Sequence, residues 1–322
     1  MPRTVRTPGG DLVLGIDAGG TRTRAALAPA RPRETPAPLL ATGTSGPGNA
    51  LSVPEETLAG HLGEAVAAAV PAPSRPRVRA VVAGFAGGSA HPGDPGRARA
   101  SHALARALAA LGIRPERSRV YGDVEIAFAA APATPDRGLV LIAGTGAVAA
   151  RIADRAVTAT SDGNGWLLGD AGSGFWIGRR AVRAVLAAAD ERGAPTLLTA
   201  AVCAHYLGTD RPPADLRDRL VRAVHARPVL DLAGLGPAVA DTAAHGDPAA
   251  RAILTTAAER LTATLAPLAP APGEPLVTTG GLLGPGGVLL PALRARLAPL
   301  GLALHPVRDG LPGATALART LL

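Results

Sequence analysis

Short apolar segments that end in glycine are the main feature of the hydropathy pattern. The first, Leu12 to Ile16, is apolar throughout and too short for a helix, which predicts a buried strand. Residues 17–21 follow, and the adjacent Gly19 and Gly20 permit a positive φ, which predicts a tight turn. Alternating side chains then continue to Leu27, as in a strand that returns beside the first. The whole segment therefore predicts a β-hairpin.

The same design occurs again further along the chain. Residues 139–152 contain an apolar strand, a Gly-Thr-Gly turn at 144–146 and a second strand. A third apolar strand, residues 275–279, ends in a glycine pair at 280–281. Because two of these three segments are close copies, the chain predicts an internal duplication that clamps a nucleotide between glycine turns.

Helix and strand patterns alternate over the rest of the chain, which predicts an α/β protein. We expect two domains, residues 1–117 and 118–322, with a terminal helix able to pack back on the first domain, and a frayed arm from Met1 to Gly10. Further strands are predicted near residues 38–42, 78–83, 118–121, 155–161 and 301–305, and helices near 55–70, 97–111, 124–131, 174–189, 195–206, 214–226, 231–244, 248–266, 288–298 and from 313.

The charge pattern narrows the range of partners. The 322-residue chain has a net charge of +8, which could indicate a nucleic acid or an anionic membrane. All 33 basic residues are arginines, however, and they are scattered singly in a chain with only 2% aromatic residues. We therefore expect a solvated basic surface, with no nucleic-acid partner and no membrane partner.

Missing residue types exclude several kinds of site. Without lysine the chain has no Walker A loop, no protein-kinase catalytic lysine and no pyridoxal-phosphate Schiff base. Its single cysteine, Cys203, excludes an internal disulfide, a cysteine-based zinc cage and a protein-ligated iron–sulfur cluster within one chain. A lone cysteine fits a reducing cytosol, and neither a signal peptide nor a membrane-spanning run is evident, so we expect a cytoplasmic protein.

Three stretches carry candidate chemistry, each with a simpler structural alternative. At the first turn, backbone N–H groups beside Asp17 suit phosphate oxygens and Mg²⁺, although an ordinary glycine hairpin has the same pattern. Asp123 stands between a strand and a helix, where an aspartate commonly caps the helix. The loop from Ser161 to Ser173 holds two carboxylates and an amide, which suits a polyhydroxylated ligand or a long ordered turn in which Asp170 acts as a cap.

Together these motifs resemble the N-acetylglucosamine kinase/BadF-type ATPase family of the actin-like superfamily. The resemblance follows the family's order from residue 12 to the end of the chain, and the block at 162–173, continued to Gly178, is its most specific piece. The fold it implies is an actin-like (ribonuclease H-like) duplicated two-domain α/β fold with nucleotide in the interdomain cleft. The matching motifs are Asp17-Ala-Gly-Gly-Thr-Arg-Thr23, Gly46-Pro-Gly-Asn49, Gly122-Asp123, Gly144-Thr-Gly146, Asp162-Gly-Asn-Gly-Trp-Leu-Leu-Gly-Asp-Ala-Gly-Ser173 and Thr279-Gly-Gly281.

The resemblance implies an ATP-dependent amino-sugar kinase that transfers the γ-phosphate to a hydroxyl, expected to be the 6-hydroxyl, of N-acetylglucosamine, glucosamine or a related sugar. ATP and Mg²⁺ are the implied cofactors, and a homodimer is a further expectation. Asp123 maps onto the catalytic aspartate, which also contacts the sugar, and Asp17 faces Mg²⁺. The implied nucleotide-binding residues are Gly19, Gly20, Thr21, Gly144, Thr145, Gly146, Gly280 and Gly281, and the implied sugar-binding residues are Asn49, Gly163, Asn164, Gly165 and Asp170.

Several residues depart from the family pattern. Those on the expected sugar side are Ala147, Val148, Asn164 and Ala171. These departures keep open a second hypothesis, a catalytically weak sugar or nucleotide sensor on the same fold. A third, an ATPase that activates a radical dehydratase, would need cysteines for an iron–sulfur cluster at a dimer interface, and the chain has only Cys203.

Overall fold

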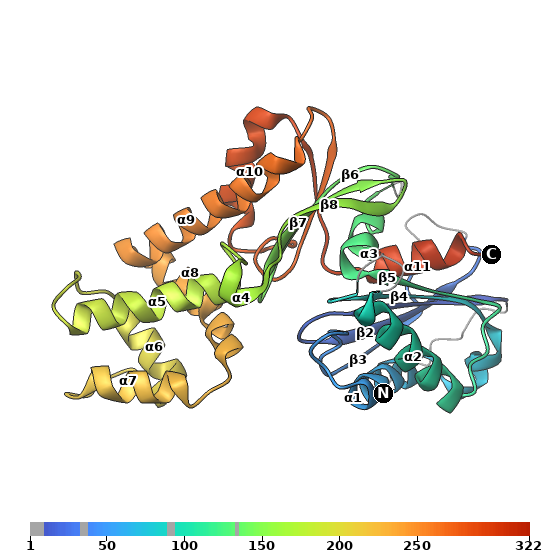
Figure 1. The fold of residues 1–322 in the computed structure, drawn as a ribbon, viewed down its shortest axis with the longest axis horizontal. Helices are drawn as coiled ribbons and strands as arrows, with labels where there is room; N and C mark the ends of the chain where they lie inside the picture. The colour runs from blue at the N-terminus through green and yellow to red at the C-terminus, as the bar shows by residue number, and fades with distance from the viewer. Residues whose placement is uncertain (1–9, 33–37, 89–93, 133–134) are drawn as a thin grey trace. The chain divides into compact units, whose positions relative to one another are not determined.

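The computed structural model describes residues 10–32, 38–88, 94–132 and 135–322, which form two compact units (Figure 1). Unit 1 comprises residues 1–140, 152–158 and 309–322, and unit 2 comprises residues 141–151 and 159–308. The expected N-terminal arm lies outside the described residues, apart from Gly10. Within the described ranges, no helix combines the length and apolarity needed to cross a bilayer.

A five-stranded mixed sheet organises unit 1, with the strand order β3-β2-β1-β4-β5. β1 (Leu12–Ala18) and β2 (Thr23–Pro29) form the antiparallel hairpin that the sequence predicts, and β3 (Ala41–Ser45) pairs with β2. β4 (Val78–Phe85) runs parallel to β1, and β5 (Arg117–Gly122) runs parallel to β4. The carboxyl ends of β1, β4 and β5 therefore meet at one edge of the sheet.

Helices cover both faces of this sheet (Figure 1). β1 is buried along its whole length, because alternate residues pack into the two separate cores. One core lies under α1 (Glu55–Ala69) and α2 (Pro95–Ala110), and the other under α3 (Asp123–Ala129) and α11 (Leu311–Arg319). A short 3₁₀ segment, η1 (Ala72–Arg77), leads into β4.

Unit 1 extends beyond the expected domain boundary at residue 117. β5 pairs with β4, and α3 packs against both of these strands, so residues 117–129 belong to unit 1. The C-terminal helix α11 contacts β1, β4 and α3 and therefore belongs to the same unit.

The second sheet has the strand order β10-β9-β6-β7-β8, and α-helices make up most of unit 2. β6, β7 and β8 each contribute residues to both units. The strands are β6 (Gly138–Ala143), β7 (Ala147–Ala153), β8 (Ala156–Asp162), β9 (Pro275–Thr279) and β10 (Ala303–Pro306). The helical segments are α4 (Gly165–Leu168), α5 (Gly174–Ala189), α6 (Leu198–Leu207), α7 (Leu216–His225), η2 (Val229–Leu235), α8 (Gly236–Ala244), α9 (Pro248–Leu265), η3 (Ala266–Leu268), α10 (Leu290–Leu297) and η4 (Ala298–Leu300).

The helix predicted over residues 231–244 is two segments in the structure. The 3₁₀ segment η2 ends at Leu235, and α8 begins at Gly236 with Pro237 in its first turn. A proline lacks the N–H that an α-helix needs beyond its first turn, so Pro237 suits the start of a helix but not its middle. The single-helix prediction is therefore wrong at this point.

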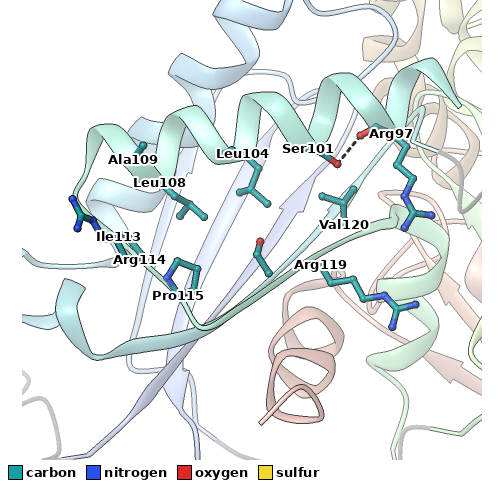
Figure 2. Close-up of a pocket in the computed structure, with 12 residues that line it drawn as sticks. Arg97, Ser101, Leu104, Leu108, Ala109, Ile113, Arg114, Pro115, Arg119 and Val120 are labelled. Carbon is teal, nitrogen blue, oxygen red and sulfur yellow. Dashed lines mark hydrogen bonds between the residues drawn. The ribbon is translucent and has the colours of Figure 1, made fainter. Parts of the chain in front are cut away.

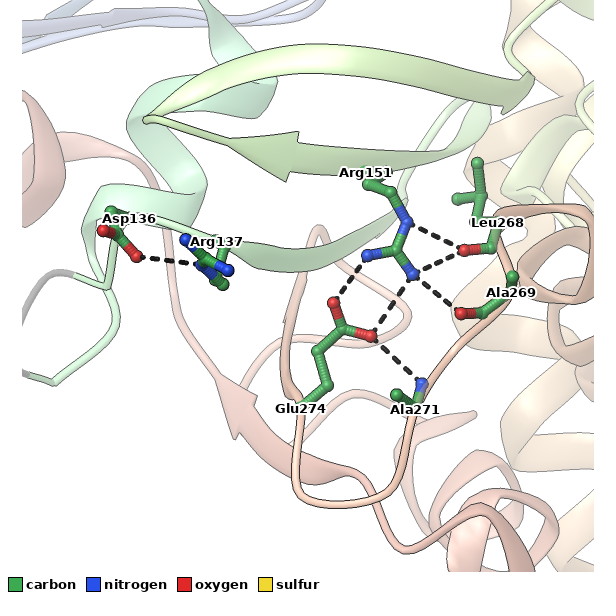
Figure 3. Close-up of polar contacts among 7 residues, drawn as sticks. All are labelled: Asp136, Arg137, Arg151, Leu268, Ala269, Ala271 and Glu274. Carbon is green, nitrogen blue, oxygen red and sulfur yellow. Dashed lines mark hydrogen bonds and ion pairs between the residues drawn. The ribbon is translucent and has the colours of Figure 1, made fainter.

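Arg151, on β7, ties the end of η3 to the start of β9 (Figure 3). Its Nη1 donates to Glu274 Oε1 at 2.7 Å, and its Nε and Nη2 donate to the carbonyl oxygens of Leu268 and Ala269, each at 2.9 Å. Glu274 also accepts from the N–H of Ala271 at 3.1 Å. The planar guanidinium matches all of these acceptors at once, which a flexible ammonium does not.

We expect Arg151→Lys to lower the free energy of unfolding by about 2 kcal/mol, because the lysine leaves partly buried acceptors without donors. Thermal unfolding monitored by circular dichroism measures the effect. The matched control is Arg137→Lys, since Arg137 pairs with Asp136 at 3.6 Å on the exposed surface. Equal losses in the two variants would contradict a special role for Arg151.

Candidate active site

Asp17 lies near the carboxyl end of β1 and is only 8% exposed. Its Oδ2 accepts from the N–H of Gly310, at the start of α11, at 3.0 Å. The same oxygen lies 3.8 Å from Nη1 of Arg24. Burial raises the pKa of Asp17 above its ordinary value, and the Gly310 N–H and the Arg24 charge oppose this shift.

Neither partner of Asp17 figured among the predicted site residues. Arg24 stands directly opposite Asp17 in the β1–β2 register, so the predicted hairpin already contained this pairing. Gly310 comes from the far end of the chain, and no local pattern predicts its contact with Asp17.

The first glycine turn is open at its tip. Gly20 and Thr21 are exposed, and Gly19 donates its N–H to the carbonyl oxygen of Arg22 at 2.9 Å. The predicted tight turn is present, and neither Gly19 nor Gly20 uses the positive φ that glycine permits. A Cβ built on Gly20 meets no atom within 4 Å. What glycine contributes here is an uncovered backbone, which suits a phosphate ligand.

The loop that carries Asn49 is hydrogen-bonded to this turn. Gly48 donates its N–H to the carbonyl oxygen of Gly19 at 2.9 Å. The Asn49 Oδ1 accepts from the N–H groups of Leu51 and Ser52 at 2.9 and 3.0 Å, which fixes the side chain against its own loop. The structure therefore brings Asn49 beside the first turn.

Asp123 is the first residue of α3, directly after β5. Its Oδ1 accepts from the N–H of Val124 at 2.9 Å. The N-cap position belongs to Gly122, whose N–H donates to Oε2 of Glu125 at 2.8 Å, so Asp123 is not the cap. Burial, together with the negative charge of Asp17, raises the pKa of Asp123 to about 7.

The carboxylate of Asp17 suits a divalent cation. Burial raises its pKa, and a cation beside it would offset this desolvation. Among the described residues, no cluster of three or more His, Cys, Asp or Glu side chains could hold a metal. Mg²⁺ commonly binds through one or two carboxylates plus water and phosphate oxygens.

The second glycine turn lies in unit 2, at the start of α5. The carbonyl oxygens of Gly144 and Thr145 accept from the N–H groups of Gly174 and Phe175 at 2.8 and 3.2 Å. The N–H of Gly144 donates across the turn to the carbonyl oxygen of Gly146 at 2.9 Å. The first amides of α5 thus hold the turn from one side.

Asp170 holds the same turn from the other side. Its side chain is 8% exposed, and its Oδ1 accepts from the N–H of Ala147 at 3.2 Å. A Cβ on Gly146 would lie 2.8 Å from Asp170 Oδ2, so any larger residue would displace the Asp170 carboxylate from the turn. Burial raises the pKa of Asp170, as does the nearby charge of Asp162. The cap of α5 is Ser173, which accepts from the N–H of Trp176.

The remaining predicted residues of unit 2 fall in two places. Gly280 has a φ of +91° and packs so closely on Ala143 that a Cβ would collide with the Ala143 carbonyl oxygen, which places the third glycine pair against the second turn. Gly163 and Asn164 are exposed in the loop between β8 and α4, and Gly165 begins α4.

The structure therefore gathers the predicted residues into two groups, one in each unit. Unit 1 brings together Asp17, Gly19, Gly20, Thr21, Asn49 and Asp123. Unit 2 brings together Gly144, Thr145, Gly146, Asp170 and Gly280, with Gly281 directly following and Gly163, Asn164 and Gly165 in the adjoining loop.

A separate hollow of about 510 Å³ lies in unit 1 between α2 and β5 (Figure 2). Its lining is apolar along Leu104, Leu108 and Val120, with Arg97 and Arg119 at one end. None of the predicted site residues lines this hollow, so it is distinct from the candidate active site.

Comparison with known proteins decides the family. The model of the BadF/BadG/BcrA/BcrD ATPase family matches residues 14–292. The chain belongs to this family. A curated relative, the N-acetylmuramic acid/N-acetylglucosamine kinase of Clostridium acetobutylicum, is 38% identical to this chain over 79 residues. That match covers 24% of this chain and 26% of the relative, so it spans about a quarter of each protein.

Solved structures of similar proteins confirm the predicted two-domain actin-like α/β fold of this BadF-family chain. A protein from Chromobacterium violaceum, provisionally assigned as an N-acetylglucosamine kinase, has a TM-score of 0.70 at 24% identity, over 97% of this chain and 100% of that one. A provisional N-acetylglucosamine kinase from Porphyromonas gingivalis has a TM-score of 0.73 at 22% identity, over 96% and 99%. The ROK-family glucokinase of Streptomyces griseus, solved with glucose and AMPPNP, has a TM-score of 0.55 at 20% identity, over 96% and 99%.

We expect Asp123→Asn to make the metal-free protein more stable than the wild type at pH 8, by about 4 kcal/mol. The raised pKa of Asp123 means that the folded state holds this proton more tightly than the unfolded state does. Between about pH 4 and pH 7 the wild type should therefore lose stability relative to the variant, and below pH 4 the difference should vanish. Thermal midpoints measured from pH 4 to pH 8 with EDTA provide the test.

The exposed Asp136, changed to Asn, serves as the control for this pH series. A stability difference between Asp123→Asn and wild type that does not grow with pH would contradict the assigned pKa.

Proposed function

We propose that this family member is an ATP-dependent amino-sugar kinase. It transfers the γ-phosphate of ATP to a hydroxyl, the 6-hydroxyl, of N-acetylglucosamine, glucosamine or a related sugar. The observation that carries the proposal is the position of Asp123 beside Asp17 at the carboxyl ends of the parallel strands of unit 1. That edge of an α/β sheet is where ligands commonly bind. Membership of an ATPase family and the names of the similar kinases support the same activity.

Asp123 has the properties of a general base that works near neutral pH. Its pKa of about 7 makes the carboxylate basic enough to take a proton from a sugar hydroxyl and still ionised in a large fraction of molecules. Because the Val124 N–H holds Oδ1, we assign the proton to Oδ2. As the hydroxyl oxygen forms its bond to the γ-phosphorus, the bond to the bridging oxygen breaks, ADP leaves and the hydroxyl proton moves to Asp123.

Backbone groups take the place of the lysine that this chain lacks. We assign phosphate contacts to Gly19, Gly20 and Thr21 in unit 1 and to the turn at 144–146 in unit 2, with Gly280 and Gly281 beside the adenosine. Asp17 would hold Mg²⁺, and the bound ion would neutralise phosphate charge during transfer. Orientation of the acceptor hydroxyl and this charge stabilisation account for most of the catalysis expected in phosphoryl transfer.

We assign sugar binding to Asn49, Gly163, Asn164 and Gly165, with Asp123 at the acceptor hydroxyl and Asp170 at the base of the same loop. Gly163 and Asn164 are exposed and lie outside any strand or helix. Their backbone and side-chain amide groups are therefore accessible for hydrogen bonds to sugar hydroxyl groups. The family departures Ala147, Val148, Asn164 and Ala171 fall in or beside this loop and would set the choice among amino sugars.

Asp123→Asn should lower kcat for amino-sugar phosphorylation at least about 100-fold while the affinity for Mg·ATP stays within about twofold of wild type. The amide keeps the shape of the side chain but cannot take the proton. Release of ADP, assayed against a panel of hexoses and hexosamines with the product position read by NMR, measures the loss. Asp136→Asn is the control, and near-normal turnover by Asp123→Asn would remove Asp123 from the mechanism.

The same panel separates an enzyme from a sensor. A wild-type protein that binds a sugar tightly but turns over none of the panel would instead be a sugar or nucleotide sensor on this fold, and the proposal of a kinase would be wrong.

A further inference from the structure

We propose that Asp162 is a positioning residue that fixes the second glycine turn through Asp170. This inference rests on the proposed contact between the turn at 144–146 and the nucleotide. It assigns a role to a residue whose sequence context predicts only a turn former.

Asp162 ends β8, and its carboxylate clamps two consecutive backbone amides. Oδ1 accepts from the N–H of Asp170 at 2.7 Å, and Oδ2 accepts from the N–H of Ala171 at 2.9 Å. Hydrogen bonds from N–H groups to a charged carboxylate are among the stronger ones in proteins, and here both oxygens are used. One side chain therefore sets the path of the backbone eight residues further along the chain.

The backbone at Asp170 needs such support. Asp170 has a φ of +57°, in the left-handed region that costs a residue with a side chain about 1 kcal/mol or more. It is also 8% exposed, so water does not readily replace a lost partner for its N–H. The Asp162 clamp holds Asp170 in this conformation.

Held in this way, Asp170 reaches the glycine turn. Its Oδ1 accepts from the N–H of Ala147 at 3.2 Å, and its Oδ2 lies against Gly146. The amides of Gly174 and Phe175 hold the carbonyl oxygens of the turn from the α5 side. The turn is thus braced on both sides, and Asp162 controls one of the two braces. Removal of that brace should loosen the phosphate contacts and leave the fold of unit 2 in place.

The chain offers a matched control for this test. Asp162 itself is left-handed, with a φ of +62°. Asp154, in the turn between β7 and β8, has a similar φ of +51°, and it is exposed. Asparagine tolerates the left-handed region, so Asp162→Asn and Asp154→Asn both keep the backbone preference and remove only a carboxylate. In Asp162→Asn the amide oxygen can still accept a hydrogen bond from one of the two N–H groups. The amide NH₂ then faces the other N–H and cannot accept from it.

Calorimetric titration of Mg·ATP into the full chain, without sugar, tests the inference. We expect Asp162→Asn to weaken Mg·ATP binding about tenfold and to lower the thermal midpoint by about 2–4 °C, and Asp154→Asn to leave both unchanged. The sugar KM of Asp162→Asn should change by a smaller factor than the affinity for Mg·ATP. Hydrogen exchange of residues 168–173 should be faster in Asp162→Asn than in wild type, and this readout remains informative if the variant binds too weakly to titrate.

The outcomes separate the inference from the proposed function. Wild-type affinity for Mg·ATP in Asp162→Asn, or a loss confined to the sugar KM, overturns the inference. A wild-type protein that binds Mg·ATP but phosphorylates no sugar overturns the proposed acceptor, while the comparison of the two variants still decides the role of Asp162. A wild-type protein that binds no Mg·ATP overturns both.

Discussion

A buried and a half-buried carboxylate of like charge at one sheet edge are the constraint on which the rest of the proposed site depends. The parallel pairing of β1, β4 and β5 carries Asp17 and Asp123 to this edge, and α11 returns from the end of the chain to give Asp17 a backbone donor at Gly310. Such an arrangement opposes folding, because each charge is desolvated and each raises the energy of the other. The packing of the two cores of unit 1 holds these strands in place despite this cost. A bound cation would relieve the electrostatic repulsion that remains between the two carboxylates.

In the proposed site, unit 2 contributes backbone groups. A chain without lysine must bind phosphate through N–H groups, arginine or a metal ion, and we assign this contact in unit 2 to the half-buried Gly144–Gly146 turn. Glycine turns are intrinsically pliable, so the side chains around them decide how well they bind. Here the first amides of α5 and the Asp162–Asp170 pair supply that rigidity. In this proposal the carboxylates of unit 1 act in the reaction, whereas those of unit 2 fix the conformation of the second glycine turn.

Local patterns predicted most of the elements and part of the site. The apolar run of β1, its hairpin partner β2 and the amphipathic helix α5 follow from periodicity, and the hairpin register places Arg24 opposite Asp17. Three features depended on tertiary structure and were missed or misplaced. Gly310 meets Asp17 only through the packing of α11, Asp162 clamps amides eight residues away across a loop, and unit 1 extends past residue 117 because β5 adds to the first sheet. Gly19 and Gly20 have negative φ values, so this glycine pair leaves the backbone of the turn uncovered and does not serve a left-handed conformation.

The pKa of the Asp123 carboxyl group is the most direct measure of this account. A ¹³C NMR titration of the metal-free protein, compared with Asp123→Asn to assign the resonance, reads it out. The account predicts a midpoint near 7 that falls in Asp17→Asn, because the neighbouring charge is then absent. A midpoint near 4 that does not respond to Asp17→Asn would contradict the central claim that these two carboxylates share one buried site.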